Sequence, residues 1–343
     1  MITYKDAGVD IQKGTDAVSR IKKHVATTYN KNVLTHIGGF GSAFSIKEIA
    51  NQYQHPVLVQ SMDGVGTKTI VARMANQFYG LGHDLLSACA NDIVVMGAKP
   101  LTLLDYLASA NLDGDVIESM IHGLSDACKE NDVALVGGEM AQMPDTYLQN
   151  EWDFVGIVTG IVEKDRIITG EKIQAGDAVI AFTSNGLHTN GFSLARKLLF
   201  ETAKIDIKDV SHDLLTPHIN YTKPVHDLLN HQIDIHGMAH ITGGGIWDNI
   251  PRILPKTHFK TCAPGRTRAR VTHPPVGPLP LRSSTSCRSD GFEMNSGGLS
   301  VEIKRGSWPI PSIFKKLVEL GDLDEQTAYH TFNMGIGLVM ILS

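Results

Sequence analysis

The chain has 343 residues, of which 42% are hydrophobic and 20% are charged, a balance typical of a globular protein with room for two domains. It has no run of about 18 uninterrupted apolar residues and no apolar signal-peptide core near its N-terminus, so we expect no membrane span, no export and a cytoplasmic location. The net charge of −5 argues against general nucleic-acid binding, which depends on clustered Lys and Arg.

The first part of the chain alternates apolar runs with helical patterns. Four runs predict buried strands, at residues 57–61, 101–107, 133–136 and 154–162. Two segments predict helices, at residues 82–96 and 115–129. In the second helix, apolar residues recur every three or four positions, which gives one face that packs on a core.

A polar connection near Asp165 precedes a second set of elements. Apolar runs predict strands at residues 178–182 and 335–342, and periodic patterns predict helices at residues 192–200, 224–230, 246–254 and 310–320. The fold class we expect is therefore α/β (α+β), with two domains covering residues 1–165 and 166–343.

Residues 257–300 do not fit this pattern. They are rich in Arg, Pro, Gly, Ser and Thr, and no hydrophobic period runs through them. We expect a disordered, locally basic surface insert, with a partner-binding or metal-binding segment as the alternative. The segment holds two of the four cysteines, Cys262 and Cys287; these and Cys89 and Cys128 form no CxxC pair and are expected to be reduced thiols.

The sharpest local motif is DGVGTK at residues 63–68, at the end of a predicted strand. Its glycines allow a ligand to approach the backbone closely, Asp63 is suited to a hard cation, and Lys68 is suited to a phosphate. The spacing of a Walker A loop is absent. An ordinary turn is the alternative interpretation.

Three further features are consistent with a site for a nucleotide and Mg²⁺. Gly38, Gly39 and Gly41 form a flexible loop able to cover phosphates, while Asp92 and Glu139 add carboxylates, the second of them beside a Gly-Gly turn. Magnesium prefers oxygen ligands and substrate phosphates. Each feature also has a structural alternative: a polar helix position for Asp92, a surface turn for Glu139 and simple mobility for the glycine loop.

Two glycine-bearing loops, at residues 184–191 and 241–245, precede predicted helices in the second half of the chain. Free N–H groups at a helix N-terminus favour an anion, so both loops are candidate phosphate sites. The candidate residues are Ser184, Asn185, Gly186, Asn190, Gly191, Thr242, Gly243, Gly244 and Gly245. His188 in the first loop is a candidate acid or base, or else an ordinary hydrogen-bonded histidine. Lys22, taken alone, is a solvated charge.

Taken together, these strings resemble the phosphoribosylformylglycinamidine cyclo-ligase (aminoimidazole ribonucleotide synthetase) family. The similar strings occur in the order of that family and cover nearly everything except residues 257–300. They are YKDAGVDI at 4–11, GGFG at 38–41, DGVGTK at 63–68, NDIVVMGAKP at 91–100, LVGGEMAQMP at 135–144, SNGLHTNGFSL at 184–194, HITGGGIWDNIPRILP at 240–255 and FNMGIGLVMIL at 332–342.

The resemblance implies a homodimer whose N-terminal domains join their strands in a shared barrel, with a C-terminal α/β layer domain beside it. It implies that ATP is the co-substrate, bound with Mg²⁺ by Gly38, Gly39, Gly41, Asp63, Lys68, Asp92 and Glu139. Asp63, Asp92 and Glu139 would be the metal ligands. The loops at 184–191 and 242–245 would hold a phosphoribosyl substrate, with His188 and Lys22 as the catalytic candidates.

The implied reaction is ATP-dependent ring closure of formylglycinamidine ribonucleotide to aminoimidazole ribonucleotide, with release of ADP and phosphate. A catalytically impaired nucleotide-binding dimer and a thiamine monophosphate kinase are the alternatives. Selenophosphate synthetase is disfavoured because no cysteine lies near the N-terminus. The sequence departs from the family pattern in three places: the insert at 257–300, the stop at Ser343 before an expected helix and strand, and TPHINYTKP at 216–224, where the family tends to have an arginine.

Overall fold

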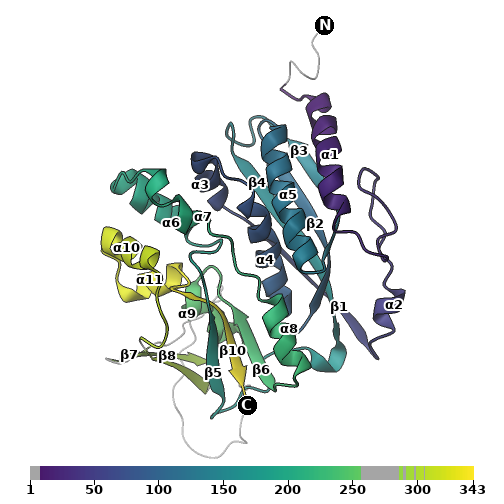
Figure 1. The fold of residues 1–343 in the computed structure, drawn as a ribbon. Helices are drawn as coiled ribbons and strands as arrows, with labels where there is room; N and C mark the ends of the chain where they lie inside the picture. The colour runs from purple at the N-terminus through teal and green to yellow at the C-terminus, as the bar shows by residue number, and fades with distance from the viewer. Residues whose placement is uncertain (1–7, 256–285, 289–290, 297–298, 305) are drawn as a thin grey trace, which may run out of the picture.

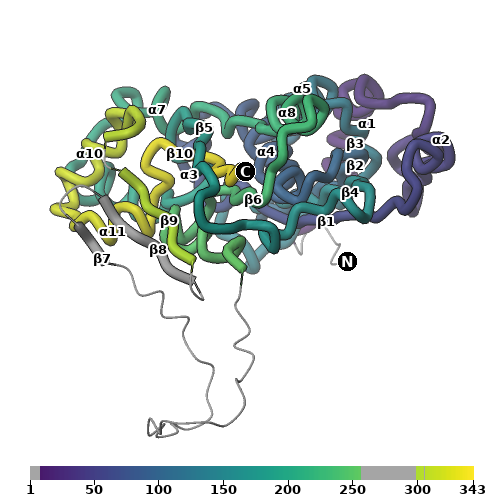
Figure 2. The backbone as a smooth tube through the Cα atoms, turned by 90° about the horizontal axis from the view of Figure 1, so that it is seen from below, coloured from purple at the N-terminus to yellow at the C-terminus, as the bar shows by residue number. Residues whose placement is uncertain are grey.

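The computed structural model describes residues 8–255, 286–288, 291–296, 299–304 and 306–343. The elements form two lobes that lie side by side (Figures 1 and 2). We call the part from α1 to β4 the N-terminal lobe and the part from β5 to β10 the C-terminal lobe. Each lobe has its own sheet and its own buried apolar core.

The N-terminal lobe is built on a four-stranded sheet with the order β1-β4-β2-β3. Strand β2 is parallel to β3, while β4 is antiparallel to both β1 and β2. The strands are β1 (Pro56–Gly64), β2 (Lys99–Ser109), β3 (Ala134–Gln142) and β4 (Trp152–Glu163). All four strands predicted from apolar runs are therefore present, each longer than its run.

Helices α1 (Ile11–Ala26), α4 (Gly80–Val94) and α5 (Gly114–Glu130) lie over one face of this sheet (Figure 1). Asp10 caps α1 and Asp113 caps α5, since each side chain accepts a backbone N–H of the first turn. Helix α1 was not predicted; its buried residues Ala17, Ile21 and Val25 are spaced four apart and face the core. Two shorter helices complete the lobe, α2 (Lys47–Ala50) and α3 (Lys68–Ala75).

Helices α4 and α5 cross in direct backbone contact. A Cβ atom added at Gly123 in α5 would overlap the carbonyl of Tyr79, and one added at Gly82 in α4 would overlap the backbone of Leu124. These two glycines therefore set the separation of the helices. Because α4 also carries Asp84 and Asp92, the crossing positions side chains of the candidate site.

The C-terminal lobe contains an antiparallel sheet with the order β5-β10-β6. Its strands are β5 (Ala178–Thr183), β6 (Ile235–His240) and β10 (Ile336–Leu342). A second antiparallel sheet has the order β7-β8-β9, with strands Ser286–Arg288, Gly291–Ser296 and Leu299–Lys304. Strands β5 and β10 were predicted, whereas β6 was missed because its His and Gly residues interrupt the apolar run.

The helices of the C-terminal lobe pack around these sheets. They are α6 (Phe192–Arg196), which continues as a π-helix (Lys197–Thr202), α7 (Ser211–Leu215), α8 (Thr222–Asn230), α9 (Gly245–Asn249), α10 (Ser312–Gly321) and α11 (Glu325–Thr331). Short 3₁₀ turns cover Lys164–Arg166, Ile207–Asp209 and Ile250–Arg252. The four helices predicted in this half are present, although the one at 246–254 is divided into α9 and a 3₁₀ turn.

Two predictions from the sequence, the Gly-Gly turn beside Glu139 and the insert at 257–300, can now be compared with the strands. Gly137, Gly138 and Glu139 lie within β3, so the expected Gly-Gly turn was wrong: the two glycines pair with Leu104 and Asp105 of β2, after a register shift that leaves Val136 as the extra residue. Of the insert expected at 257–300, residues 257–285, 289–290 and 297–298 lie outside the described residues. The described remainder belongs to β7, β8 and the start of β9.

The open face of the N-terminal sheet carries apolar side chains. Met62 pairs with Ile157, which pairs with Leu104, so one row of apolar side chains runs across β1, β4 and β2. The side chains of Met62, Ile157 and Leu104 are 66%, 39% and 38% exposed to solvent.

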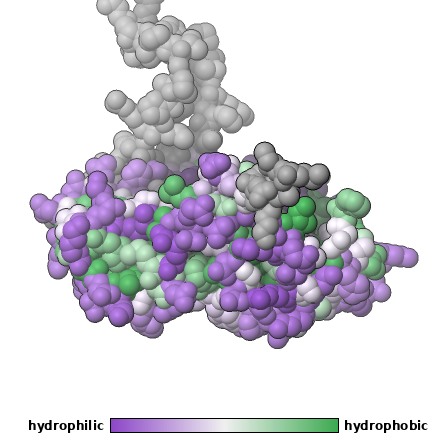
Figure 3. All heavy atoms as spheres, turned by 90° about the horizontal axis from the view of Figure 1, so that it is seen from above, coloured by the Kyte–Doolittle hydropathy of each residue, from purple (hydrophilic) through white to green (hydrophobic). Residues whose placement is uncertain are grey.

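Seen from above, the surface of the protein is mostly hydrophilic with scattered hydrophobic residues (Figure 3). Among the described residues, no helix has the length and apolar character needed to span a membrane.

Replacing Gly123 by Ala tests the α4–α5 crossing. Because the new methyl group overlaps backbone atoms of Tyr79, we expect Gly123→Ala to lower the free energy of unfolding by about 3 kcal/mol or more. Gly14→Ala is the matched control, since Gly14 in α1 has room for a Cβ and should gain about 0.5–1 kcal/mol. Urea unfolding measures both, and equal stability of the two variants would contradict the close crossing.

Candidate functional site

A buried ion pair lies where the lobes meet. Lys68, the first residue of α3, is fully buried, and its Nζ donates to Oδ1 of Asp84 in α4 at 2.8 Å. The same ammonium donates to the backbone oxygens of His188 (3.1 Å) and Thr216 (3.0 Å) in the C-terminal lobe. All three donors of Lys68 therefore have acceptors within the protein. Its predicted contact with ATP stays a prediction.

Asp84 connects the lobes a second time. Its Oδ1 also accepts the backbone N–H of His218 at 2.8 Å. Burial lowers the pKa of Lys68 and raises the pKa of Asp84, and the attraction between the two charges opposes both shifts. A pair held in this way depends on each partner, because either one alone would be an uncompensated buried charge.

Asp63 and Asp92 approach each other next to this junction. Asp63 lies near the end of β1, and Asp92 lies in the last turns of α4. Burial raises the pKa of Asp63, and the nearby charge of Asp92 raises it further, whereas Gly64, which donates its N–H to Asp63 at 2.7 Å, and the charge of His240 oppose the shift. Two partly buried carboxylates that repel each other suit a divalent cation, which prefers oxygen ligands.

Asp92 is held at both carboxylate oxygens. Ser61 Oγ donates to Oδ2 at 3.0 Å, and Nδ1 of His240 lies 2.8 Å from Oδ1. His240 is the last residue of β6, in the C-terminal lobe. The sequence did not single out Ser61 or His240, although His240 directly precedes the ITGGG string.

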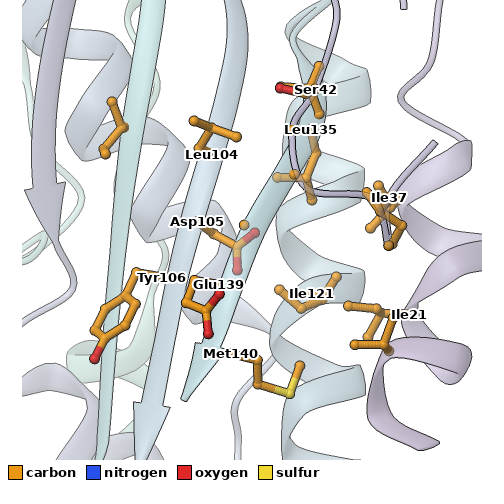
Figure 4. A pocket seen from close by; sticks show the side chains of 18 of the residues that line it. Ile21, Ile37, Ser42, Leu104, Asp105, Tyr106, Ile121, Leu135, Glu139 and Met140 are labelled. Atoms are coloured by element: carbon orange, nitrogen blue, oxygen red, sulfur yellow. The ribbon is translucent and has the colours of Figure 1, made fainter. Parts of the chain in front are cut away.

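The predicted glycine loop lines a cavity of about 800 Å³ in the N-terminal lobe. Gly38, Gly39, Gly41 and Glu139 are among its lining residues, and Figure 4 shows Glu139 there. Lys22 on α1 is close by, since a side chain at Gly38 would contact its end. The structure thus brings together four of the residues predicted to bind ATP and the catalytic candidate Lys22.

Glu139 is separate from the other two carboxylates. Strand pairing places Asp63, Gly156, Asp105 and Gly138 in one row across the sheet, so their side chains share a face, and Glu139, the next residue of β3, faces the opposite way. Within the described ranges, no three His, Cys, Asp or Glu side chains are grouped to hold a metal ion. Asp63 and Asp92 fit a cation as a pair, and Glu139 as a third ligand stays a prediction.

Asp105 is a cavity residue that sequence reasoning missed. It lines the same cavity from β2 (Figure 4), and burial raises the pKa of its carboxyl group to about 7. The available signal was a charged residue inside the apolar run LTLLDYL, which is unusual for a strand between two others.

The two loops predicted to bind phosphate lie together in the C-terminal lobe. Gly191 precedes α6 and Gly244 precedes α9, both with positive φ, so the loops do lead into helices. A Cβ at Gly243 would lie 3.5 Å from Oδ1 of Asn190.

Internal hydrogen bonds order both loops. Ser184 Oγ donates to Asn333 Oδ1 at 2.8 Å, and Asn333 Nδ2 donates to the oxygen of Gly186 at 2.8 Å. Asn185 Nδ2 donates to the oxygen of Pro217 at 2.9 Å.

In the second loop, Asn249 Nδ2 donates to the oxygen of Gly245 at 2.7 Å and lies 3.4 Å from the oxygen of Thr242. The backbone of both loops is therefore held in a defined conformation.

His188 is buried between the lobes. Its side chain is 1% exposed, its φ is +59°, and its ring stacks on His218 with centroids 4.0 Å apart. Neither ring nitrogen has a hydrogen-bond partner among the described residues. Burial holds the pKa of His188 well below its ordinary value, so the ring is neutral. Its catalytic role stays a prediction.

Comparison with known proteins relates the whole chain to one group. Models of the N-terminal and C-terminal domains of AIR synthase related proteins match residues 48–162 and 174–261. The phosphoribosylformylglycinamidine cyclo-ligase of Bacillus cereus (strain G9842) is 41% identical over 345 residues, which cover 98% of this chain and 87% of that protein.

Solved structures share the fold at low identity. Thiamine-monophosphate kinase from Stenotrophomonas maltophilia K279a has a TM-score of 0.59 and 16% identity, over 95% of this chain and 84% of that one. Hydrogenase maturation protein HypE in complex with ATP has a TM-score of 0.56 and 14% identity, over 96% of this chain and 78% of that one.

The buried pair predicts a large loss of stability on removal of its cation. Lys68→Met leaves Asp84 unpaired, and we expect the free energy of unfolding to fall by about 3–5 kcal/mol. Lys31→Met, which removes the cation of the exposed pair with Glu48, should cost less than about 1 kcal/mol. Chemical unfolding of both variants measures the difference, and similar losses would show that the Lys68–Asp84 pair is not a structural constraint.

Proposed function

Because the chain belongs to the family of phosphoribosylformylglycinamidine cyclo-ligases, we propose that it closes the imidazole ring of aminoimidazole ribonucleotide in purine biosynthesis. The observation that carries this conclusion is an identity of 41% over 98% of the chain. The reaction consumes ATP and formylglycinamidine ribonucleotide. It yields aminoimidazole ribonucleotide, ADP and phosphate.

The chemistry requires activation of an amide oxygen, which is a poor leaving group. The formyl oxygen attacks the γ-phosphorus of ATP and ADP departs. An amidine nitrogen then attacks the formyl carbon, loses a proton, and phosphate leaves with the former amide oxygen. Catalysis of this sequence depends mainly on positioning and on stabilising phosphoryl charge.

We assign the nucleotide to the N-terminal lobe. Gly38, Gly39 and Gly41 line the cavity, where their backbone N–H groups would be donors for phosphate oxygens, and Lys22 supplies a cation next to Gly38. Asp63 and Asp92 would hold Mg²⁺, which neutralises phosphate charge when bound. The solved complex of HypE with ATP, a protein of the same fold, supports a nucleotide site in this architecture.

We assign the phosphoribosyl substrate to the loops at 184–191 and 242–245. Both lead into helices and lie against each other, so their backbone N–H groups can converge on one phosphate. His188 is the acid–base candidate of the first loop, because a neutral imidazole is able to accept the proton that the attacking nitrogen loses. The assignment gives each lobe one substrate, so the formyl oxygen and the γ-phosphate would have to meet at the lobe junction.

We further propose that the chain forms a homodimer through the open face of the N-terminal sheet. The row of Met62, Ile157 and Leu104 leaves large apolar side chains in water unless another surface covers them. A second copy of the same sheet would cover the row and close the strands into a shared barrel. Such closure removes exposed apolar area and supports the cavity beside β3.

Asp63 gives the direct test of the metal assignment. We expect Asp63→Asn to reduce turnover of formylglycinamidine ribonucleotide by at least about 100-fold, because phosphoryl charge loses its cation. Thermal stability should stay equal or rise, since the substitution removes a buried charge that repels Asp92. Asp165→Asn, at an exposed position in a 3₁₀ turn, is the control. Normal turnover of Asp63→Asn would remove Asp63 from the assignment.

The dimer is tested by a charge on the open sheet face. Met62→Lys should shift the protein from dimer to monomer in sedimentation equilibrium, because a lysine cannot be buried at an apolar interface without a partner. Ile233→Lys changes a 40% exposed residue in the C-terminal lobe and should leave the dimer intact. A monomeric wild-type protein, or a dimer unaffected by Met62→Lys, would refute this interface.

A further inference from the structure

Phe40 has the greatest exposure of the large hydrophobic residues in the described part of the chain. Its side chain is 116% exposed, compared with 79% for Leu148, so the ring stands free in solvent. Phe40 is also one of the residues that line the cavity of about 800 Å³. An aromatic ring that stays in water forgoes the free energy of burial, so its place beside a cavity calls for a physical explanation.

The loop that carries Phe40 has a fixed base. Leu34 donates its N–H to the oxygen of Ala43 at 2.9 Å. Ala43 in turn donates its own N–H to Oγ1 of Thr35 at 2.8 Å. These bonds hold the two ends of the loop together, and we call residues 38–42 between them the tip.

The tip makes few contacts. Within the described residues, Phe40, Gly41 and Ser42 make no hydrogen bond. A Cβ added at Gly41 would find no described atom within 4 Å, and one at Gly39 would meet only the oxygen of Gly41 at 3.9 Å. Glycines on both sides of Phe40 also allow backbone angles that are closed to other residues. The tip can therefore fold over the cavity without breaking an existing hydrogen bond.

Residues from α1, α5 and β3 give the cavity an apolar wall. They include Ile21, Val25, Ile121 and Leu135, each of which is at most 8% exposed. Figure 4 shows Ile21, Ile121 and Leu135 beside the cavity. Such a wall suits the flat face of a heterocyclic base, and the volume suits a ligand of nucleotide size. A base that lies on this wall has a second face, which needs another cover.

We propose that Phe40 is this cover: when the nucleotide binds, the tip closes over the cavity and the Phe40 ring stacks on the base. Stacking on an aromatic side chain is favourable for every base, because each base presents a π face. Closure removes both faces of the base and one face of the ring from water. The proposal rests on the proposed function in one respect, namely that the nucleotide lies in the N-terminal lobe.

Lys22 and Gly38 indicate which way the nucleotide lies along the loop. A Cβ added at Gly38 would lie 3.9 Å from Nζ of Lys22, so the cation meets the start of the tip. The charged phosphates belong at that end. Phe40 follows two residues later, and two residues of extended chain span about 7 Å. The ring is therefore placed beyond the phosphates by roughly the length of a ribose, which is where the base would be.

The first experiment follows the ring itself. Phe40→Trp places a fluorescent indole at position 40 of the full chain, and the signal of the wild-type protein is subtracted to remove Trp152, Trp247 and Trp308. We expect quenching by acrylamide to fall severalfold when Mg²⁺ and a non-hydrolysable ATP analogue are added. Mg²⁺ with tripolyphosphate, which has no base, should leave the quenching unchanged. Unchanged quenching with the analogue, or equal protection by tripolyphosphate, would overturn the proposal.

The second experiment measures what the ring contributes to binding. For Mg²⁺ with the same analogue in calorimetry, we expect Phe40→Ala to lose about 10-fold or more in affinity, and Phe40→Tyr, which keeps an aromatic face, to lose less than about threefold. Leu148→Ala is the matched control, because it removes an exposed side chain that does not line the cavity. Wild-type affinity in Phe40→Ala, or an equal loss in Phe40→Tyr, would overturn the proposal. Thermal stability should not change, since position 40 is fully exposed.

The same samples separate two other outcomes. If a second copy of the chain covers Phe40, the indole of Phe40→Trp is protected before any ligand is added, and Phe40→Ala shifts the protein toward monomer in sedimentation equilibrium. Either result would overturn the proposal. A wild-type chain that does not bind the analogue refutes the proposed nucleotide site together with the role of Phe40, whereas equal binding by the wild-type chain and Phe40→Ala refutes the role of Phe40 alone.

Discussion

The buried pair of Lys68 and Asp84 is the interaction on which the site depends. Lys68 binds two carbonyls of the C-terminal lobe, and Asp84 binds a backbone N–H of that lobe, so four hydrogen bonds meet at one ion pair. This arrangement fixes how α3 and α4 lie against the segment around residue 217. Only with that relation fixed does His240 of one lobe reach Asp92 of the other. The ion pair thus acts as a constraint on geometry as well as a source of stability.

Local pattern was sufficient for much of the fold. The strands of the N-terminal sheet, and β5, β10 and most helices of the C-terminal lobe, follow from apolar runs and helical spacing, because burial of a continuous face is what those patterns encode. Local pattern failed where contacts between distant segments determine which residues form a strand. Gly137 and Gly138 remain in β3 through a bulge, and β6 forms although His236, Gly237 and His240 interrupt its apolar residues.

The site, like the fold, could be predicted from the sequence only in part. Glycine and carboxylate motifs indicated the loop at 38–41, Asp63 and Asp92, and the structure gathers the loop with Lys22 and Glu139, and Asp63 with Asp92. The partners of Asp92 could not be predicted, since His240 is 148 residues away in sequence and its contact depends on the lobe packing. The hydrogen bonds of Lys68 to internal acceptors could not be predicted either. The sequence motif of a lysine after a glycine loop is the same whether the lysine binds a phosphate or a buried aspartate.

The position of β10 has a consequence for the order of events during synthesis. This strand lies between β5 and β6 and pairs with both, yet it follows β5 by about 150 residues, a separation that makes closure slow. While the ribosome is still translating, the edges of β5 and β6 have no central neighbour, whereas all four strands of the other sheet have already emerged. The nascent C-terminal half is therefore the part that most needs protection by chaperones until residues 336–342 arrive.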